Sequence, residues 1–437
     1  MNRFIIIFFG IMIAASVNAQ KYSLQQSIDV AIKNNIQVRQ SNLAMETSDI
    51  NRRQARYNLL PDLNANIGHG INQGRSIDPF TNQYATQQIN YAGYGLSSGV
   101  VLFNGMSLQN IVKQNSYAYD ASKMEWQQAK DNLTLNIILA YLKVLNSQEI
   151  IASTTSQVEL SKKQLERLEI MDKEGAINPS LVTDIKGQLM NDQISLINAT
   201  TELETSKLNL SQLMNIPYTK SMELESLDVD GVVAGYGQTP EEIYQTALKQ
   251  FALIKLVDLR TKSAQYALRA SKGALFPTVF FNANANTNFS SAALNTSGKI
   301  PYQEQLDNNI FTNVNIGLSI PIFNSLAARN RIKLAAIVVK RTELEEENTR
   351  LIVRQQIEQS SLLLANSFER YKALVEQVAA YRMSFNAAEA RFNAGLGSSV
   401  DYLIAKNNLD RASINLISSK YDFLLRKRVV DYYGGVR

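Results

Sequence analysis

The chain contains no cysteine, and for its length it has little histidine, tryptophan, proline or glycine. Its 437 residues include one histidine, one tryptophan, 8 prolines and 20 glycines, where average usage would give about 22 prolines and about 30 glycines. The lack of cysteine excludes disulfides, thiolate metal sites and lipid attachment through an N-terminal cysteine. A single histidine, His69, disfavours histidine metal sites and acid–base catalysis. We therefore expect no catalytic residues, no metal, no cofactor and no enzyme activity.

Neither the basic nor the acidic residues form long blocks in the sequence. The 44 basic and 39 acidic residues give a net charge of +5 and are spread along the chain. The densest basic cluster, Arg426–Arg428, lies beside apolar residues, which is typical of an amphipathic helix rather than a nucleic-acid site. Neighbouring carboxylates such as Glu345 and Glu346 could in principle serve glycoside hydrolysis, but they lie in a charged helix face. No nucleic-acid partner is expected.

A long hydrophobic run occurs only at the N-terminus. Arg3 precedes the apolar run Phe4–Ala15, and the small residues Val17 and Ala19 follow it. This pattern predicts a cleaved signal peptide over residues 1–19. A membrane anchor is the alternative, but the run is shorter than the ~20 residues that span a bilayer. We therefore expect an exported protein.

Two long stretches, Met106–Glu174 and Ile322–Ala394, contain neither proline nor glycine. A helix over either stretch would be about 100 Å long at 1.5 Å per residue. Bulky residues recur in them every seven positions, at Ile137, Val144, Ile151, Val158 and Leu165, and again at Ile357, Leu364, Tyr371, Val378, Phe385 and Phe392. In the first stretch a mostly small residue follows three positions later, which favours close-packed, supercoiled helices. An isolated dimeric coiled coil would instead favour leucine at that second position.

The chain is an internal duplication. Shifting it by 216 residues places Leu60-Pro61 on Phe276-Pro277, and a shift of 220 places Gly175 on Gly395. We predict a first repeat over 20–215, a connector over 216–239 and a second repeat over 240–437. The first repeat contains a short helix (Leu24–Asn58), strands 62–73 and 90–103, a long helix 105–174 and a short helix 180–214. The second contains a short helix (Pro240–Leu275), strands 278–289 and 310–322, a long helix 324–394 and a short helix 399–432.

Each predicted strand has one apolar and one polar face. Phe281, Ala283 and Ala285 alternate with asparagines, for example. Strands of about 9–11 residues with such faces suit a membrane barrel, although a small soluble sheet packed on helices has the same pattern. Four strands cannot close a barrel, and an open edge cannot exist in lipid. A barrel therefore requires several copies of the chain.

The segment Arg391–Ile404 reads RFNAGLGSSVDYLI, and Leu60–Leu63 and Phe276–Val279 each place a proline at a helix-to-strand corner. These motifs resemble those of the TolC-like outer-membrane efflux protein family. The resemblance covers essentially the whole chain beyond the signal peptide. The resemblance implies a mainly α fold with a small membrane β-barrel part: a duplicated long-helix coiled-coil tunnel plus four strands per protomer, completed as a 12-stranded barrel in a homotrimer. It also implies an outer-membrane location with a long periplasmic extension.

The resemblance further implies an exit duct of a tripartite efflux or type I secretion system. The partners would be a periplasmic adaptor (membrane fusion protein), an inner-membrane pump such as an RND or ABC transporter, and outer-membrane lipid. In such channels an acidic ring closes the periplasmic end, six and nine residues after the tip glycine. Asp401 is six after Gly395 and Asp184 is nine after Gly175, but Ile404 and Leu181 occupy the two matching positions. The gate pattern is thus split between the repeats.

Two readings of these tip residues stay open. Asp401 and Asp184 could form the periplasmic gate, or they could complement the dipole at a helix N-terminus. The tip turns, with Gly175, Asn178, Pro179, Gly395, Gly397 and Ser399, are the implied adaptor contacts, but plain hairpin turns have the same composition. For the whole chain, the alternative function is a periplasmic coiled-coil scaffold or adaptor without a pore.

Overall fold

The computed structural model describes residues 21–77, 81–86, 88–227, 237–296 and 298–435. The predicted signal peptide and part of the predicted connector, residues 228–236, lie outside these described residues. The chain divides into two compact units. Of the described residues, unit 1 comprises 21–41, 126–227, 237–251 and 351–435, and unit 2 comprises those within 42–125 and 252–350.

Helices make up most of the structure, and two of them are 67 residues long: α3 (Ser107–Lys173) and α8 (Ala327–Asn393). The shorter helices are α1 (Leu24–Asn34), α2 (Ile36–Tyr57), α4 (Pro179–Met214), α5 (Pro240–Gln250), α6 (Ala252–Gly273), α7 (Tyr302–Asn308) and α9 (Ser399–Tyr433). A mainly α fold built around two very long helices is thereby confirmed. Among the described residues, no helix combines the length and the apolar character needed to cross a membrane.

The first helical stretch of each repeat is interrupted, where the sequence predicts one continuous helix. The interruptions are at Asn35, between α1 and α2, and at Phe251, between α5 and α6. Both residues have extended backbones, with φ and ψ of −65° and 125° at Asn35 and −68° and 125° at Phe251. The two positions are equivalent under the shift of 216 residues, so the break belongs to the duplicated unit. Neither residue is proline or glycine, which is why composition does not reveal it.

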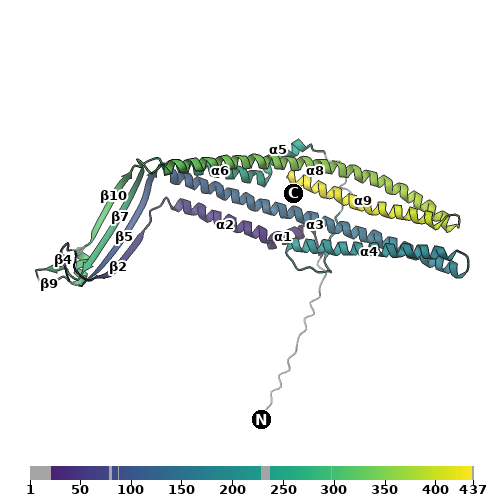
Figure 1. Cartoon of the computed structure of the whole chain (residues 1–437), viewed down its shortest axis with the longest axis horizontal. Coiled ribbons are helices and arrows are strands. Elements are labelled where there is room, and N and C mark those ends of the chain that lie inside the picture. Colours follow the sequence, from purple (N-terminus) through teal and green to yellow (C-terminus); the bar gives the residue numbers. More distant parts are fainter. Residues whose placement is uncertain (1–20, 78–80, 87, 228–236, 297, 436–437) are drawn as a thin grey trace, which may run out of the picture. The chain divides into compact units, whose positions relative to one another are not determined.

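Four antiparallel strands of unit 2 form one sheet in the order β10-β7-β5-β2 (Figure 1). Their bounds are β2 (Asn64–Asn72), β5 (Ile89–Asn104), β7 (Thr278–Ser290) and β10 (Phe311–Ser319). Within the described ranges, two-residue strands form three further pairs: β1 (Lys21–Tyr22) with β6 (Glu223–Leu224), β3 (Ser76–Ile77) with β4 (Tyr84–Ala85), and β8 (Leu294–Asn295) with β9 (Gly298–Lys299). Strands β2 and β10 are the edges of the four-stranded sheet.

The register of this sheet separates an amide-bearing face from an apolar face. On one face, Asn284 of β7 pairs with Asn313 of β10. On the other, Phe281 of β7 pairs with Ile316 of β10 and with Val100 of β5. The alternation seen in the sequence therefore continues across neighbouring strands.

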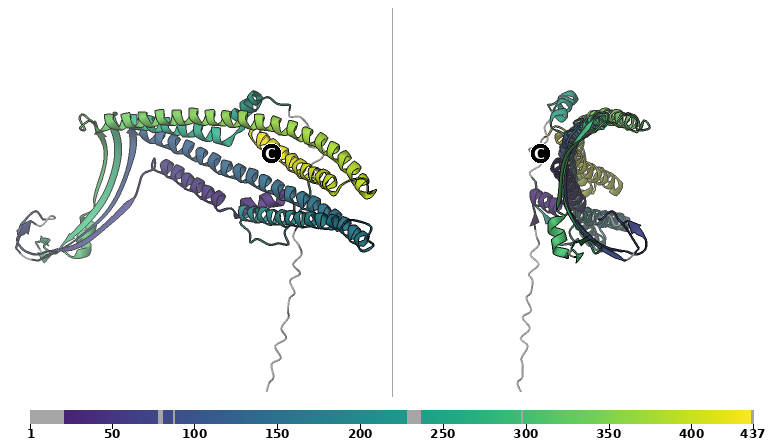
Figure 2. Two further views of the ribbon diagram at one scale, coloured as in Figure 1. Left: turned by 45° about the vertical axis from the view of Figure 1, so that its right-hand side comes forward. Right: turned by 90° about the vertical axis from the view of Figure 1, so that its left-hand side faces the viewer.

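The short helix α7 identifies the apolar face as the convex one. The ring of Tyr302 lies 4.6 Å from that of Phe289, and its hydroxyl forms a hydrogen bond with Tyr94. Both partners lie on the same face as Phe281, because Phe289 is eight residues further along β7 and Tyr94 pairs with Thr287. Figure 2 shows α7 on the convex side of the curved sheet. The amide-bearing face is therefore concave.

In unit 1, most heptad positions form the core between the helices, whereas Ile151, Val158 and Tyr371 are half-buried. Ile137 and Val144 of α3 and Ile357 of α8 are buried. The small positions between them are buried as well, namely Ala140, Ser147, Thr154 and Ser161. Small side chains at these positions allow neighbouring helices to approach closely.

Candidate functional site at the helical tip

Two short turns close the helical hairpins of unit 1, from α3 to α4 and from α8 to α9 (Figure 1). Each contains a glycine with a left-handed backbone: φ is +71° at Gly175 and +74° at Gly395. The N–H groups of Ala176 and Leu396 then donate to carbonyls five residues earlier, at 2.9 Å in both turns. These bonds satisfy carbonyls at the helix ends, and glycine adopts the required φ without steric cost.

The helices that leave these turns begin with side-chain caps. The Asn178 side chain accepts a hydrogen bond from the Ser180 N–H at 3.0 Å, and Pro179 occupies the first helical position of α4. At the start of α9, the Ser398 hydroxyl accepts from the Asp401 N–H at 3.1 Å. Asn178 and Pro179 were expected in this turn from the sequence, whereas Ser398 was not singled out.

Gly397 and Ser399 pack closely within the second turn. A Cβ atom on Gly397 would lie 3.2 Å from the backbone nitrogen of Phe392, so a side chain there would crowd the end of α8. The Ser399 side chain is buried, and its hydroxyl donates to Oδ2 of Asp184 at 2.9 Å. The structure thus brings together two predicted site residues that lie in different hairpins.

Asp401 and Asp184 differ in their surroundings. The carboxylate of Asp401 is exposed in the first turn of α9, and within the described chain it forms no hydrogen bond or ion pair. Asp184 is also exposed but accepts the Ser399 hydroxyl. In the single chain, the Asp401 carboxylate is therefore free, whereas the Asp184 carboxylate is hydrogen-bonded to the neighbouring hairpin.

A second link between the hairpins involves residues that the sequence analysis did not identify. The Arg167 guanidinium of α3 donates to the side-chain oxygen of Asn393 at 2.5 Å and to its carbonyl at 3.2 Å. Asn393 is the last residue of α8. No local pattern marks this pair, because its members are 226 residues apart.

A buried charge cluster further joins α4 to α9. The ammonium of Lys406 is 2.8 Å from Oδ2 of Asp192 and 2.6 Å from Oδ2 of Asp410. Asp192 also accepts hydrogen bonds from the Ser161 hydroxyl at 2.5 Å and from the Gln188 amide at 2.8 Å. Lys406 is 1% exposed, so these bonds replace its lost hydration. The spacing of four residues from Lys406 to Asp410 was the only signal in the sequence.

An aromatic cluster lies next to this charge cluster. The Tyr402 ring stacks on Phe392 at 4.9 Å and lies 5.7 Å from the ring of Phe385. Burial is the main cause that raises the pKa of the Tyr402 hydroxyl, with further contributions from Glu389, Asp410 and Asp192. Leu165, Leu168, Ile185 and Leu189 complete the cluster from α3 and α4. The tip turns therefore rest on a packed four-helix core.

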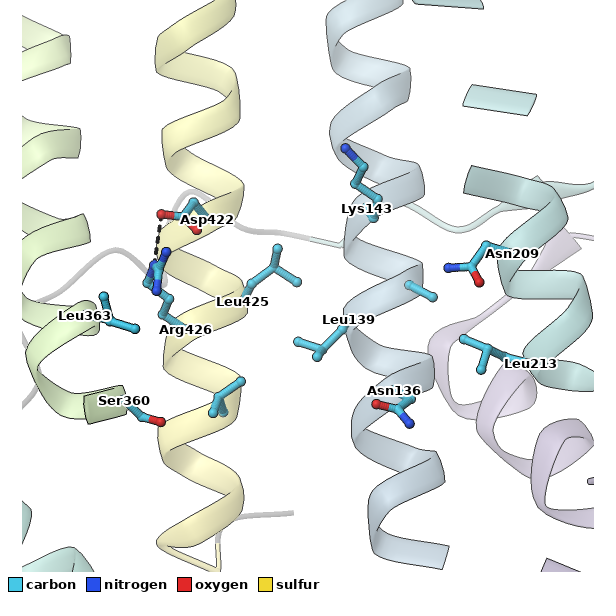
Figure 3. Close-up of a pocket in the computed structure, with 12 residues that line it drawn as sticks. Asn136, Leu139, Lys143, Asn209, Leu213, Ser360, Leu363, Asp422, Leu425 and Arg426 are labelled. Atoms are coloured by element: carbon cyan, nitrogen blue, oxygen red, sulfur yellow. Dashed lines mark hydrogen bonds and ion pairs between the residues drawn. The ribbon is translucent and has the colours of Figure 1, made fainter. Parts of the chain in front are cut away.

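A groove in unit 1 lies between the same four helices, away from the tip (Figure 3). Leu139 and Leu425 extend into the space between α3 and α9 (Figure 3). The charged groups that line it are already paired: Arg426 with Asp422 at 2.9 Å, and Lys143 with Glu202 at 2.8 Å. In the part of the chain that the structure describes, no group of histidine, cysteine and acidic residues could hold a metal ion.

Known proteins match this chain over both repeats. The family model "Outer membrane efflux protein" matches residues 27–215 and 243–427. Outer membrane protein TolC of Escherichia coli strain K12 is 22% identical over 432 residues, which cover 98% of this chain and 85% of TolC.

Solved structures share the fold over nearly the whole chain. The structure of CusC has a TM-score of 0.81 and 15% identity, covering 94% of this chain and 91% of CusC. The outer membrane protein VceC of Vibrio cholerae has a TM-score of 0.79 and 14% identity, covering 94% of this chain and 96% of VceC.

Proposed function

Because the chain belongs to the outer membrane efflux protein family, we propose that three copies form the exit duct of a tripartite efflux or type I secretion system. The family inferred from the sequence motifs is thereby confirmed. In this proposal the strands of three protomers close a 12-stranded barrel in the outer membrane. The long helices extend from it into the periplasm as a tunnel.

The observation that carries the proposal is the pair of open edges on the sheet. The four strands end in β2 on one side and β10 on the other. An edge strand has unpaired N–H and C=O groups, which lipid cannot satisfy. Pairing β2 of one copy with β10 of the next removes both edges at once. The apolar convex face would then contact lipid, and the concave amide face would line a water-filled lumen.

The helices next to the two edge strands support the same pairing. α2 precedes β2, and it exposes Leu43, Ile50 and Tyr57 at intervals of seven residues, each about 60% exposed. α8 follows β10 and exposes Ile337 and Leu344, also seven residues apart. Two apolar stripes with the same spacing, beside the two open edges, suit a helix contact between neighbouring copies.

Disulfide cross-linking tests this proposal, because the natural chain has no cysteine. We would introduce Ile50→Cys and Ile337→Cys together, because both lie about 10–15 Å along their helices from the sheet, oxidise the protein in membranes and measure its size on a denaturing gel. A ladder that ends at the trimer is expected. The matched control pairs Ile50→Cys with Ser263→Cys, which lies on α6 rather than on an edge helix. If both cysteine pairs give only a monomer band, and the protein is extracted without detergent, the poreless periplasmic scaffold is favoured instead.

The tip is the proposed site of adaptor contact and gating. Leu396 is 82% exposed in the turn between α8 and α9, where an apolar side chain suits docking of a periplasmic adaptor. An RND or ABC pump in the inner membrane would supply the energy. Three copies of Asp401 and Asp184 would form the acidic constriction that adaptor contact widens. The free carboxylate of Asp401 supports this role, although a carboxylate in a first helical turn also complements the helix dipole.

A further inference from the structure

A collar of exposed basic residues surrounds the helix ends of unit 2 next to the four-stranded sheet. Residues 50–61, 105–119, 263–277 and 320–339 adjoin the strands on α2, α3, α6 and α8, and these windows contain no aspartate or glutamate. Their exposed basic residues are Arg53, Arg56, Lys113, Arg269, Lys272, Arg329, Arg331 and Lys333. The charges are dispersed in the sequence, and the fold gathers them at one level.

Most of the collar lacks internal charge partners. Arg53 is 3.1 Å from Asp49. Among the described residues, none of the other seven has a carboxylate oxygen within 4.0 Å. Many basic residues elsewhere are paired, for example Lys143 with Glu202 at 2.8 Å. Asp49 and Asp62 adjoin the first window, but eight cations outnumber them, so the collar carries a net positive charge. This charge attracts anions over roughly one Debye length, about 8 Å at physiological salt.

The place of the collar in the fold suggests the anion. Lys113 follows the last residue of β5, Asn104, by nine residues, and Arg329 follows the last residue of β10, Ser319, by ten. α3 begins at Ser107 and α8 at Ala327, so at 1.5 Å per helical residue Lys113 lies about 9 Å and Arg329 about 3 Å beyond the start of its helix. Phospholipid headgroups occupy the layer just beyond the hydrocarbon core. If the strands cross the bilayer, the collar lies at or next to the headgroups of the periplasmic leaflet.

The side chains have the chemistry of a membrane interface. Lys113 and Arg269 lie 5.4 and 4.7 Å from the ring of Tyr266, so an amphipathic aromatic is flanked by two cations. Arg329 and Arg331 are two residues apart on α8 and so point to nearly opposite sides. However α8 is rotated about its own axis, at least one of these two side chains therefore points away from the axis of a pore.

We propose that this collar binds anionic phospholipid headgroups of the periplasmic leaflet of the outer membrane. The proposal rests on the proposed function, because it requires the strands to lie in that membrane. Each basic residue near an anionic bilayer surface contributes about fivefold in affinity. The collar therefore favours phosphatidylglycerol over a zwitterionic lipid, and the preference weakens as salt rises.

Native mass spectrometry of the full-length protein in a neutral detergent tests this. The probes are phosphatidylglycerol and phosphatidylcholine with the same acyl chains. Phosphatidylglycerol should be retained preferentially, and Lys113→Gln with Arg269→Gln and Arg329→Gln should reduce its apparent affinity at least tenfold. The charge-keeping set Lys113→Arg, Arg269→Lys and Arg329→Lys should retain it. The matched control, Lys162→Gln with Lys163→Gln and Lys186→Gln, removes three exposed lysines of unit 1 and should change nothing.

Equal retention of both lipids, or equal loss in the control set, would overturn the proposal. So would unchanged lipid binding together with an altered anion selectivity of the pore, because the collar would then line the lumen. If the protein fails to cross-link as a trimer in membranes, the proposed function fails instead. The two failures are therefore distinguishable.

Discussion

The ammonium of Lys406 on α9 lies 2.8 Å from Oδ2 of Asp192 on α4, and both side chains are buried. The two residues are 214 positions apart, in different repeats of the chain. A buried ion pair is weak evidence for net stability, but removing one partner leaves an uncompensated charge in a low-dielectric core. We therefore expect loss of either partner to make the two helical hairpins separate more readily near the tip.

Replacing one member of the pair should loosen the tip more than replacing the whole cluster. Lys406→Met leaves Asp192 and Asp410 unpaired, at a cost of about 3–5 kcal/mol. Amides of α9 around residue 406 should then exchange hydrogen about a hundredfold faster or more. Adding Asp192→Asn and Asp410→Asn should recover much of the protection. As a control, Lys372→Met breaks an exposed pair with Glu369 and should change exchange by a few-fold at most.

The cluster should also respond to pH through Asp410. Burial raises the pKa of this carboxyl above its ordinary 3.8, and the nearby Lys406 partly opposes that shift. The Asp410 carboxyl therefore binds its proton more tightly in the folded state than in the unfolded chain. The stability that this proton contributes is fully present below pH 3.8, and it is lost as the pH rises through the pKa of the folded state. Hydrogen exchange of α9, compared with Asp410→Asn at each pH, should show protection that declines over this range. A constant ratio between the two proteins would contradict the prediction.

Neutralising the proposed gate should open the channel to ions. Asp401→Ala with Asp184→Ala removes six carboxylates from a trimer, and a ring of carboxylates attracts cations. Single-channel recordings in planar bilayers should show higher conductance and weaker block by multivalent cations. Glu169→Ala, which removes an exposed carboxylate on α3, is the control. Unchanged recordings would leave Asp401 with the helix-dipole role and Asp184 with its hydrogen bond from Ser399.

Adding a charge at the exposed tip should weaken adaptor binding. Burying a leucine contributes about 1.5–3 kcal/mol, so Leu396→Asp should lower affinity at least tenfold. The measurement is binding of the purified trimer to the adaptor encoded by a neighbouring gene. Met383→Asp is the control, because Met383 is 71% exposed on α8, twelve residues before the tip glycine Gly395. Equal affinity for both variants would place the adaptor contact elsewhere.

The Tyr141 hydroxyl should hold the first strand of the described chain in place. It lies 2.6 Å from the Glu225 carbonyl and 3.0 Å from the Tyr22 carbonyl. Burial is the main cause that raises the pKa of Tyr141 to about 12, so it stays a donor at neutral pH. Tyr141→Phe removes the hydroxyl that both carbonyls contact, and each lost hydrogen bond costs about 0.5–1.5 kcal/mol. The Glu225 amide, which donates to the Tyr22 carbonyl, should exchange at least fivefold faster, whereas Tyr381→Phe should have no effect there.

Local periodicity made much of the fold predictable from the sequence. Heptads and two stretches without proline or glycine indicate the long helices, and the alternation around Phe281 indicates the strands. Gly175 and Gly395 mark the helix ends because a left-handed turn favours glycine. These features depend on residues close in sequence, so no tertiary contact is needed to read them.

Contacts between distant residues were decided by the tertiary structure alone. The sequence could mark Asp184 and Ser399 separately, but only the fold joins them, at 2.9 Å. The sequence does not show that Lys406 is buried. Its burial results from the packing of α4 against α9. The basic collar has the same origin, because four chain segments carry its charges and only their alignment below the sheet makes one field. Sequence determines which elements form, and the burial and pairing of charge depend on which elements meet.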